Sequence, residues 1–176
     1  MKIEMQGQGS EAFYREVVNI VSQYSGLMKR PEAPLRDNFS QMKRSAVISV
    51  FLFAVLSAMT IFWGASILTI IALTLTAVNI AFCASHLINL NRSLKGLMAD
   101  TRKTALVFDG DGVAVEKDGA QTVRFAWESI AFARKFGESL ALFSGKPAGV
   151  ITANLQYEEE IMKYLKEKKP DIRMIS

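Results

Sequence analysis

The chain of 176 residues has one cysteine, Cys83, and one histidine, His86. A single cysteine cannot form an intrachain disulfide, so nothing in the sequence indicates an oxidising compartment. One histidine and one cysteine cannot supply the four ligands of a structural zinc site. Both residues lie in an apolar stretch, so the polar part of the chain has no histidine for a Ser-His-Asp triad. These shortages exclude disulfide-stapled domains, intrachain zinc sites and the common hydrolase triads.

The sequence also lacks complete loops for phosphate or calcium. Gly145-Lys146 is followed by Pro147, where a phosphate-binding loop needs Ser or Thr. Asp109-x-Asp111 is not followed by the further oxygen ligands of a calcium loop. We therefore expect no cofactor and no metal, and a protein that is not an enzyme. An enzyme that uses Glu or Lys side chains of the carboxy-terminal part is a weaker alternative.

Charge is absent from Ser45 to Asn91. One membrane-spanning helix needs about 20 apolar residues, and this stretch exceeds twice that length. The sequence therefore predicts a two-helix transmembrane hairpin over residues 45–90, with spans at about 45–63 and 66–88. Trp63-Gly64-Ala65-Ser66 is the expected reversal, because Trp favours the membrane interface and Gly gives the turn its freedom.

The basic residues lie on both outer flanks of the hairpin, and its turn is uncharged. The positive-inside rule then places both termini in the cytoplasm, in a bacterial cytoplasmic (inner) membrane. The net charge of +4 belongs to these flanks and not to the carboxy-terminal part, which argues against nucleic acid as a partner. The candidate contacts to the membrane surface are Lys29, Arg30, Arg36, Lys43, Arg44, Arg92, Lys95, Arg102 and Lys103.

Polar residues inside lipid are functional candidates by default, and Asn79 and His86 are the candidates here. We favour a structural role for both over a place on a transport path. Small residues recur at Ala54-x-x-x-Ala58 and at Ala77-x-x-x-Ala81-x-x-x-Ser85. Such ridges let helices approach closely, so they predict packing inside the hairpin or, alternatively, between copies in a homo-oligomer.

Residues 1–44 read as a cytoplasmic amino-terminal segment that ends in a basic linker. Residues 1–9 are expected to be frayed, and a helix is expected from Ser10, a suitable N-cap. Apolar residues from Phe13 to Met28 fall on one helical stripe, and Pro31 bars continuation. The stripe either lies on the membrane surface or packs on protein, and we slightly favour protein.

From Thr104 the apolar period changes from helical to alternating. Short strands are expected at 104–109, 112–117, 121–127, 130–136, 139–144 and 149–153, separated by turns such as Asp-Gly. The short connections predict an antiparallel sheet with one buried face. A final helix is expected from the N-cap Asn154 to Pro170, with Glu at its start and Lys at its end.

Trp127 is expected to fill the core of residues 104–176 at a corner of the sheet. Arg134-Lys135 and Lys146 have two interpretations. They form a basic rim beside the membrane, or they are ordinary solubilising charges at a sheet edge.

A bent antiparallel sheet or barrel capped by a carboxy-terminal helix is the architecture of pleckstrin-homology-like domains. With the hairpin before it, the segment LVFDGDGVAVEKDGAQTVRFAWESIAFARKFGESLALF resembles the YcxB-like family of bacterial membrane proteins. Phe125-x-Trp127-Glu128-x-Ile130 stands at the family's tryptophan–acidic–aliphatic position, whereas its later proline-containing strand is poorly reproduced. The resemblance covers roughly residues 40–170 and implies an uncharacterised membrane protein of α+β fold, with no activity attached.

The sequence thus predicts a membrane hairpin that displays a cytoplasmic pleckstrin-homology-like domain at residues 104–176. Its expected partners are the lipid bilayer and an unidentified membrane or cytoplasmic protein, or alternatively anionic lipid. The competing hypothesis is an oligomeric transporter or channel subunit, in which Asn79 and His86 face a shared lumen.

Overall fold

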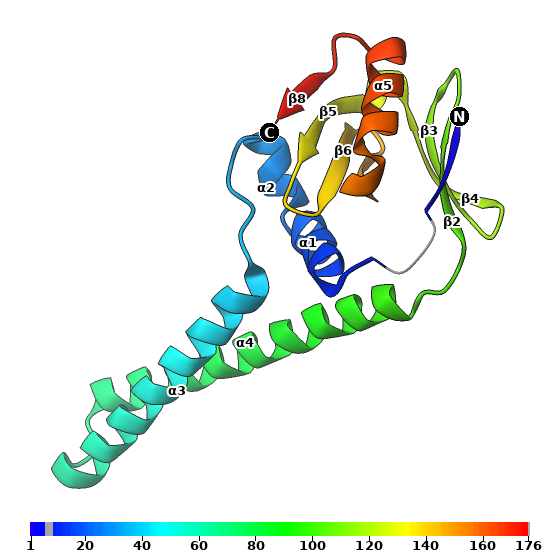
Figure 1. Cartoon of the computed structure of the whole chain (residues 1–176). Coiled ribbons are helices and arrows are strands. Elements are labelled where there is room, and N and C mark those ends of the chain that lie inside the picture. Colours follow the sequence, from blue (N-terminus) through cyan, green and yellow to red (C-terminus); the bar gives the residue numbers. More distant parts are fainter. Residues whose placement is uncertain (6–8, 176) are drawn as a thin grey trace. The chain divides into compact units, whose positions relative to one another are not determined.

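The computed structural model describes residues 1–5 and 9–175 of the chain. They form two compact units. Figure 1 labels the helices and strands of both and colours them along the sequence. Residues 36–95 make up the first, called here the hairpin unit. Residues 1–35 and 96–176 make up the second, called here the α+β unit. The fold class is the expected one, a helical hairpin together with two β-sheets capped by a carboxy-terminal helix.

Two long helices form the hairpin, α3 (Asn38–Trp63) and α4 (Ile67–Ala99). The side chain of Asp37 caps α3 by accepting the Phe39 N–H at 3.1 Å. Gly64 has φ +86°, a left-handed conformation that permits the reversal between the helices. Both helices continue beyond the predicted spans into the basic flanks, because charged residues such as Lys and Arg are good helix formers.

The hairpin points its large apolar side chains outward. Ile61, Phe62 and Trp63 are 80%, 81% and 79% exposed, and an 18-residue apolar window in each helix has a mean hydropathy of 2.3 in α3 and 2.2 in α4. The core helix of a water-soluble protein would bury such residues. Length, hydropathy and exposure together favour insertion into a lipid bilayer, where these side chains face acyl chains.

Polar and small side chains join the two helices to each other. Asn79 Nδ2 donates to Ser49 Oγ at 2.6 Å and to Ser45 Oγ at 3.5 Å. Ser49 and Cys83 are buried. The small-residue ridges predicted to pack inside the hairpin are instead exposed: Ala54, Ala58, Ala77, Ala81 and Ser85. That expectation of intramolecular packing was wrong, because spacing alone does not say which face of a helix meets its neighbour.

The α+β unit contains two four-stranded sheets. Sheet A has the order β1-β2-β3-β4 and is antiparallel throughout, and sheet B has the order β7-β6-β5-β8. The strands of sheet A are β1 (Lys2–Met5), β2 (Thr104–Phe108), β3 (Gly112–Lys117) and β4 (Ala120–Ala126). The strands of sheet B are β5 (Ile130–Lys135), β6 (Ser139–Gly145), β7 (Ala148–Asn154) and β8 (Arg173–Ile175). The six strands expected between residues 104 and 153 are present, with ends shifted by a residue or two.

Strands β1 and β8 were not predicted. The expectation of a frayed amino terminus was wrong for residues 2–5, because Ile3 is buried in the main core and β1 pairs with β2. Strand β8 follows Pro170 and pairs parallel with β5, so the expected antiparallel sheet is not wholly antiparallel. Both strands are short and find their partners far along the chain, so the local periodicity within each is too brief to identify a strand or its partner.

Helix α5 (Glu158–Lys168) packs on the core between the sheets through Ile161 and Leu165. Its start differs from the predicted one. Asn154 caps a short 3-10 turn (Leu155–Tyr157) by accepting the Gln156 N–H at 3.0 Å, and α5 begins after that turn. Figure 1 shows α5 in orange beside β6.

Two amino-terminal helices, α1 (Glu11–Ser22) and α2 (Tyr24–Lys29), pack on sheet B. Ser10 is the N-cap, and its Oγ accepts the Phe13 N–H at 3.0 Å. Ile20 and Leu27 are buried with Phe132 and Phe143 in a second apolar cluster. Of the two interpretations of the apolar stripe, packing on protein is the one the structure shows, with a break at Gln23 between the helices.

Candidate functional site

The α+β unit has a cleft of about 860 Å³, a volume typical of ligand sites. It lies between an outer strand of each sheet, β1 and β7, and α1 and the end of α4 also contribute to its wall. Its charged residues are four basic and four acidic: Lys2, Arg102, Lys103, Lys117, Glu4, Asp100, Glu116 and Asp118.

Ion pairs within the cleft wall neutralise much of this charge. Lys2 Nζ lies 3.0 Å from Glu116, a pair that raises the pKa of the Lys2 ammonium. Asp100 accepts from the Arg102 guanidinium at 2.7 Å and from Lys117 Nζ at 2.9 Å. Hydrogen bonds from Arg102 first, and from Lys117 second, hold the pKa of the Asp100 carboxyl well below its usual range. The cleft is therefore polar but close to electrically neutral.

Apolar side chains of α1 form another part of the wall, through Phe13 and Val17. A Cβ at Gly9, just before α1, would meet the Phe13 ring at 2.4 Å, so a larger residue there would displace that ring. The Gly9 N–H donates to Tyr14 Oη at 3.2 Å. The cleft thus combines an apolar surface with a charged but balanced one.

Helix α1 is tied to the β5–β6 turn by one carboxylate. Glu16 accepts the N–H groups of Gly137 and Glu138, each at 2.8 Å, and the Ser139 hydroxyl at 2.7 Å. Successive backbone N–H groups make an anion-binding concavity. Here that concavity is filled by the chain's own carboxylate, which fixes one wall of the cleft.

Arg134 holds the segment after α2. It is 8% exposed, and its Nη1 donates to the carbonyls of Pro31 and Ala33 at 2.6 and 2.7 Å. Its guanidinium lies 4.7 Å from the centre of the Phe136 ring, a cation–π contact. Burial lowers the pKa of this guanidinium. Arg134 thus does not join a basic rim with Lys135, which pairs with Glu158 at 2.6 Å.

The predicted membrane-surface residues occupy several elements. Lys29 ends α2 and Arg30 follows it, Lys43 and Arg44 lie in α3, and Arg92 and Lys95 lie in α4. Arg36 precedes α3. Arg102 is paired with Asp100 inside the cleft wall, and the Lys103 backbone N–H donates to Asp118 at 3.0 Å.

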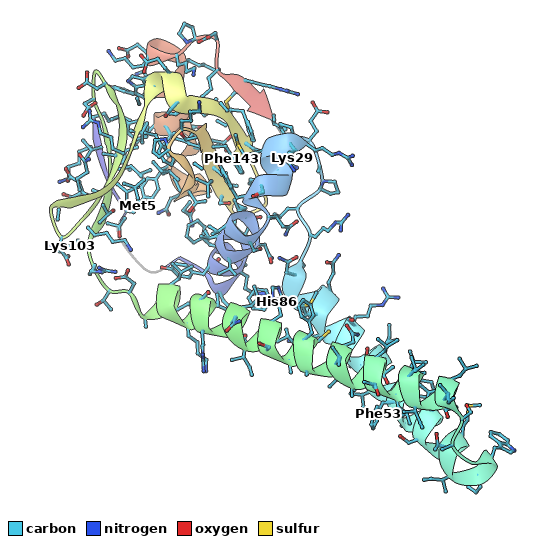
Figure 2. The ribbon with its side chains drawn as sticks, turned by 180° about the vertical axis from the view of Figure 1, so that it is seen from behind. Met5, Lys29, Phe53, His86, Lys103 and Phe143 are labelled. Atoms are coloured by element: carbon cyan, nitrogen blue, oxygen red, sulfur yellow. The ribbon has the colours of Figure 1, made fainter. Side chains whose placement is uncertain are left out.

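The intramembrane candidates have local partners. Asn79 is bonded to Ser49 of the other helix, and the His86 ring, labelled on α4 in Figure 2, stacks on Phe82 one turn earlier, with centroids 6.1 Å apart. The hydroxyls of threonines such as Thr76 donate to carbonyls of their own helix. The Asn79 amide therefore serves as a link between α3 and α4.

Trp127 lies in the main core and is 7% exposed. Its indole N–H donates to the Asp109 carbonyl at 3.1 Å, and its ring packs near Phe108 and Tyr164. Arg124 pairs with the Asp109 carboxylate at 2.8 Å. Hydrogen bonds from the backbone N–H of Asp111 first and of Gly112 after it, followed by the charge and side-chain hydrogen bonds of Arg124, lower the pKa of Asp109.

The cleft was not predicted from the sequence. Its residues are scattered over β1, α1, the end of α4, β3 and β7, and no motif connects them. A signal existed in the amino-terminal Lys2-Ile3-Glu4-Met5, whose alternation suits a half-buried strand. Its short length concealed it.

No protein family profile matches the chain, and no curated protein matches it. One similar solved structure is the MyTH4-FERM MF2 domain of myosin VII from Dictyostelium discoideum, at 11% identity and a TM-score of 0.34. The match covers 88% of this chain and 37% of that one, so the chain spans about a third of the length of that structure.

Proposed function

We propose that the chain is a non-enzymatic protein of the bacterial cytoplasmic membrane whose α+β unit binds a polypeptide partner in the cytoplasm. The apolar, outward-facing hairpin supports the membrane location, and the basic flanks support cytoplasmic termini. The resemblance to the YcxB-like family supports the same arrangement of hairpin and cytoplasmic domain.

The balance of charge in the cleft is the observation that favours a polypeptide over anionic lipid. Four basic and four acidic side chains line it, and Lys2, Arg102 and Lys117 are paired with carboxylates. An anionic headgroup would need an excess of unpaired cations, each contributing about 1 kcal/mol near a charged surface. A polypeptide, with N–H and C=O groups and side chains of both signs, matches a neutral polar wall.

Site-specific photo-crosslinking in intact cells tests this function. A photoreactive amino acid replaces Thr152 in the cleft of the full chain, and the matched control replaces Asp171, which is exposed and outside the cleft. We expect a discrete polypeptide adduct from position 152 and none from position 171. Adducts to phospholipid alone, or equal adducts from both positions, would contradict the proposal.

The alternative is an oligomeric transporter or channel subunit built from the hairpin. Its support is the exposure of the ridges at Ala54 and Ala58 and at Ala77, Ala81 and Ser85, which leaves them open to a second copy. This alternative predicts a stable oligomer in mild detergent and loss of flux in Asn79→Leu. A monomer that shows no flux would reject it.

A further inference from the structure

We infer that the cleft binds its partner as an extended segment that adds to the free edge of β7 as a β-strand. This inference rests on the proposed polypeptide-binding function and names its site and mode. It depends on which backbone groups β7 leaves unpaired, on what else lines the cleft, and on the charge of the wall.

The register of sheet B determines which N–H groups of β7 point away from β6. Leu155 N–H donates to the Glu138 carbonyl at 3.2 Å, and Asn154 is aligned with Ser139. Hydrogen-bonded pairs alternate with non-bonded pairs in an antiparallel ladder. The backbone groups of Thr152 and Val150, aligned with Ala141 and Phe143, therefore face away from β6.

These two residues line the cleft, and β7 has no neighbour on that side in sheet B. Among the described residues, no side chain or loop supplies a hydrogen bond to the backbone of Thr152 or Val150. An open strand edge is a template for another strand. Addition of an extended peptide to such an edge is a general mode of recognition, in which backbone hydrogen bonds supply much of the affinity.

Of the two strands whose free edges border the cleft, β7 is better suited than β1 to bind an extended segment. Strand β1 is short, and the Glu4 carbonyl on its free edge already accepts from Tyr157 Oη at 3.4 Å. Strand β7 is longer, Ala148–Asn154, and it is the edge to which we assign the partner. A volume of about 860 Å³ suits one extended segment of a few residues and not a folded domain.

The chemistry of the segment follows from the two kinds of wall. Side chains of a strand alternate between its faces. One face would contact Phe13 and Val17 of α1, and the other would lie near the ion pairs of Lys2 and Lys117. We therefore expect a segment that alternates apolar and polar residues and has no large net charge.

The probe is a displayed library of random nine-residue peptides, selected against the full chain in nanodiscs. We expect enrichment of alternating, near-neutral peptides that slow hydrogen exchange at the amides of residues 150 and 152 and leave those of 124 and 126 unchanged. We expect Thr152→Pro to weaken their binding at least tenfold, because proline removes an N–H that the β6–β7 ladder does not use.

The matched control is Ala126→Pro on β4, the outer strand of sheet A away from the cleft. Trp127 N–H donates to Asp111, so the Ala126 N–H faces away from β3, and its φ of −66° suits proline. We expect binding within twofold of the unaltered chain. Thr152→Ala, which keeps the N–H, is expected to bind normally. If Thr152→Pro does not fold, the exchange measurement on the unaltered chain decides alone.

The outcomes separate the two proposals. Peptides that bind without protecting residues 150 and 152, or that tolerate Thr152→Pro in a folded chain, overturn strand addition and leave polypeptide binding standing. Failure to enrich any peptide overturns strand addition too, and the polypeptide-binding function then depends on the photo-crosslinking result. Enrichment of helical or strongly basic peptides points to a different occupant and overturns the inference.

Discussion

Replacing Glu16 by alanine should loosen α1 from the β5–β6 turn. The Glu16 carboxylate accepts three hydrogen bonds, from the N–H groups of Gly137 and Glu138 and from the Ser139 hydroxyl, at 2.7–2.8 Å. These three hydrogen bonds join one carboxylate of α1 to the start of β6 and the turn before it. Its loss therefore acts on one defined junction.

The expected cost follows from the number and kind of these bonds. Hydrogen bonds to a charged group contribute about 1.5–3 kcal/mol each when buried. The turn is partly exposed, so water takes over the freed N–H groups and the total falls to about 2 kcal/mol. Local opening of α1, and not global unfolding, is the process affected, because α1 packs on the outside of sheet B.

Native-state hydrogen exchange of the full chain in nanodiscs measures this opening. A change of about 2 kcal/mol corresponds to roughly 30-fold faster exchange. We expect this acceleration at the amides of Val17, Val18 and Ile20 of α1, with β6 unchanged. Glu16→Gln keeps one acceptor oxygen and is expected to fall between alanine and the unaltered chain.

The matched control is Glu11→Ala, on the exposed first turn of the same helix. Removing an acidic residue there costs a few tenths of a kcal/mol through the helix dipole. Exchange within twofold of the unaltered chain for Glu16→Ala, or equal effects of both substitutions, would refute the account of the turn as a carboxylate-binding site.

Three further predictions concern the hairpin, the cleft and the orientation. Asn79→Leu should destabilise the hairpin by about 1 kcal/mol in a denaturation assay, and adding Ser49→Ala should cost little more, since the two share one hydrogen bond; additive costs would contradict the link. The lowered pKa of Asp100 means that its carboxylate stabilises the fold at neutral pH and that this stability is lost as pH falls below about 4. The melting temperature of Asp100→Asn should therefore fall less steeply with decreasing pH than that of the unaltered chain, and an equal slope would reject this role. In a Cys83→Ser background, a membrane-impermeant maleimide should label Ala65→Cys from outside intact cells and leave Lys103→Cys unlabelled, whereas the reverse would overturn the proposed topology.

The apolar helical hairpin and most of the carboxy-terminal strands could be predicted from the sequence because their signals are local. The length of the charge-free run can be compared directly with the thickness of a bilayer. Alternating apolar residues between Asp-Gly turns indicate each strand, whichever strand it pairs with. The N-cap at Ser10 could also be predicted, because capping joins residues only three apart in the sequence.

Only the tertiary structure decided what depends on distant pairing. Strand β1 joins β2 across a hundred residues, β8 pairs parallel with β5 after the last helix, and the small-residue ridges of the hairpin turn outward. The cleft and the Glu16 junction arise where these long-range pairings meet, so no stretch of sequence contains them. Local periodicity specifies which face of an element is apolar, and the packing of the whole chain selects the surface that covers it.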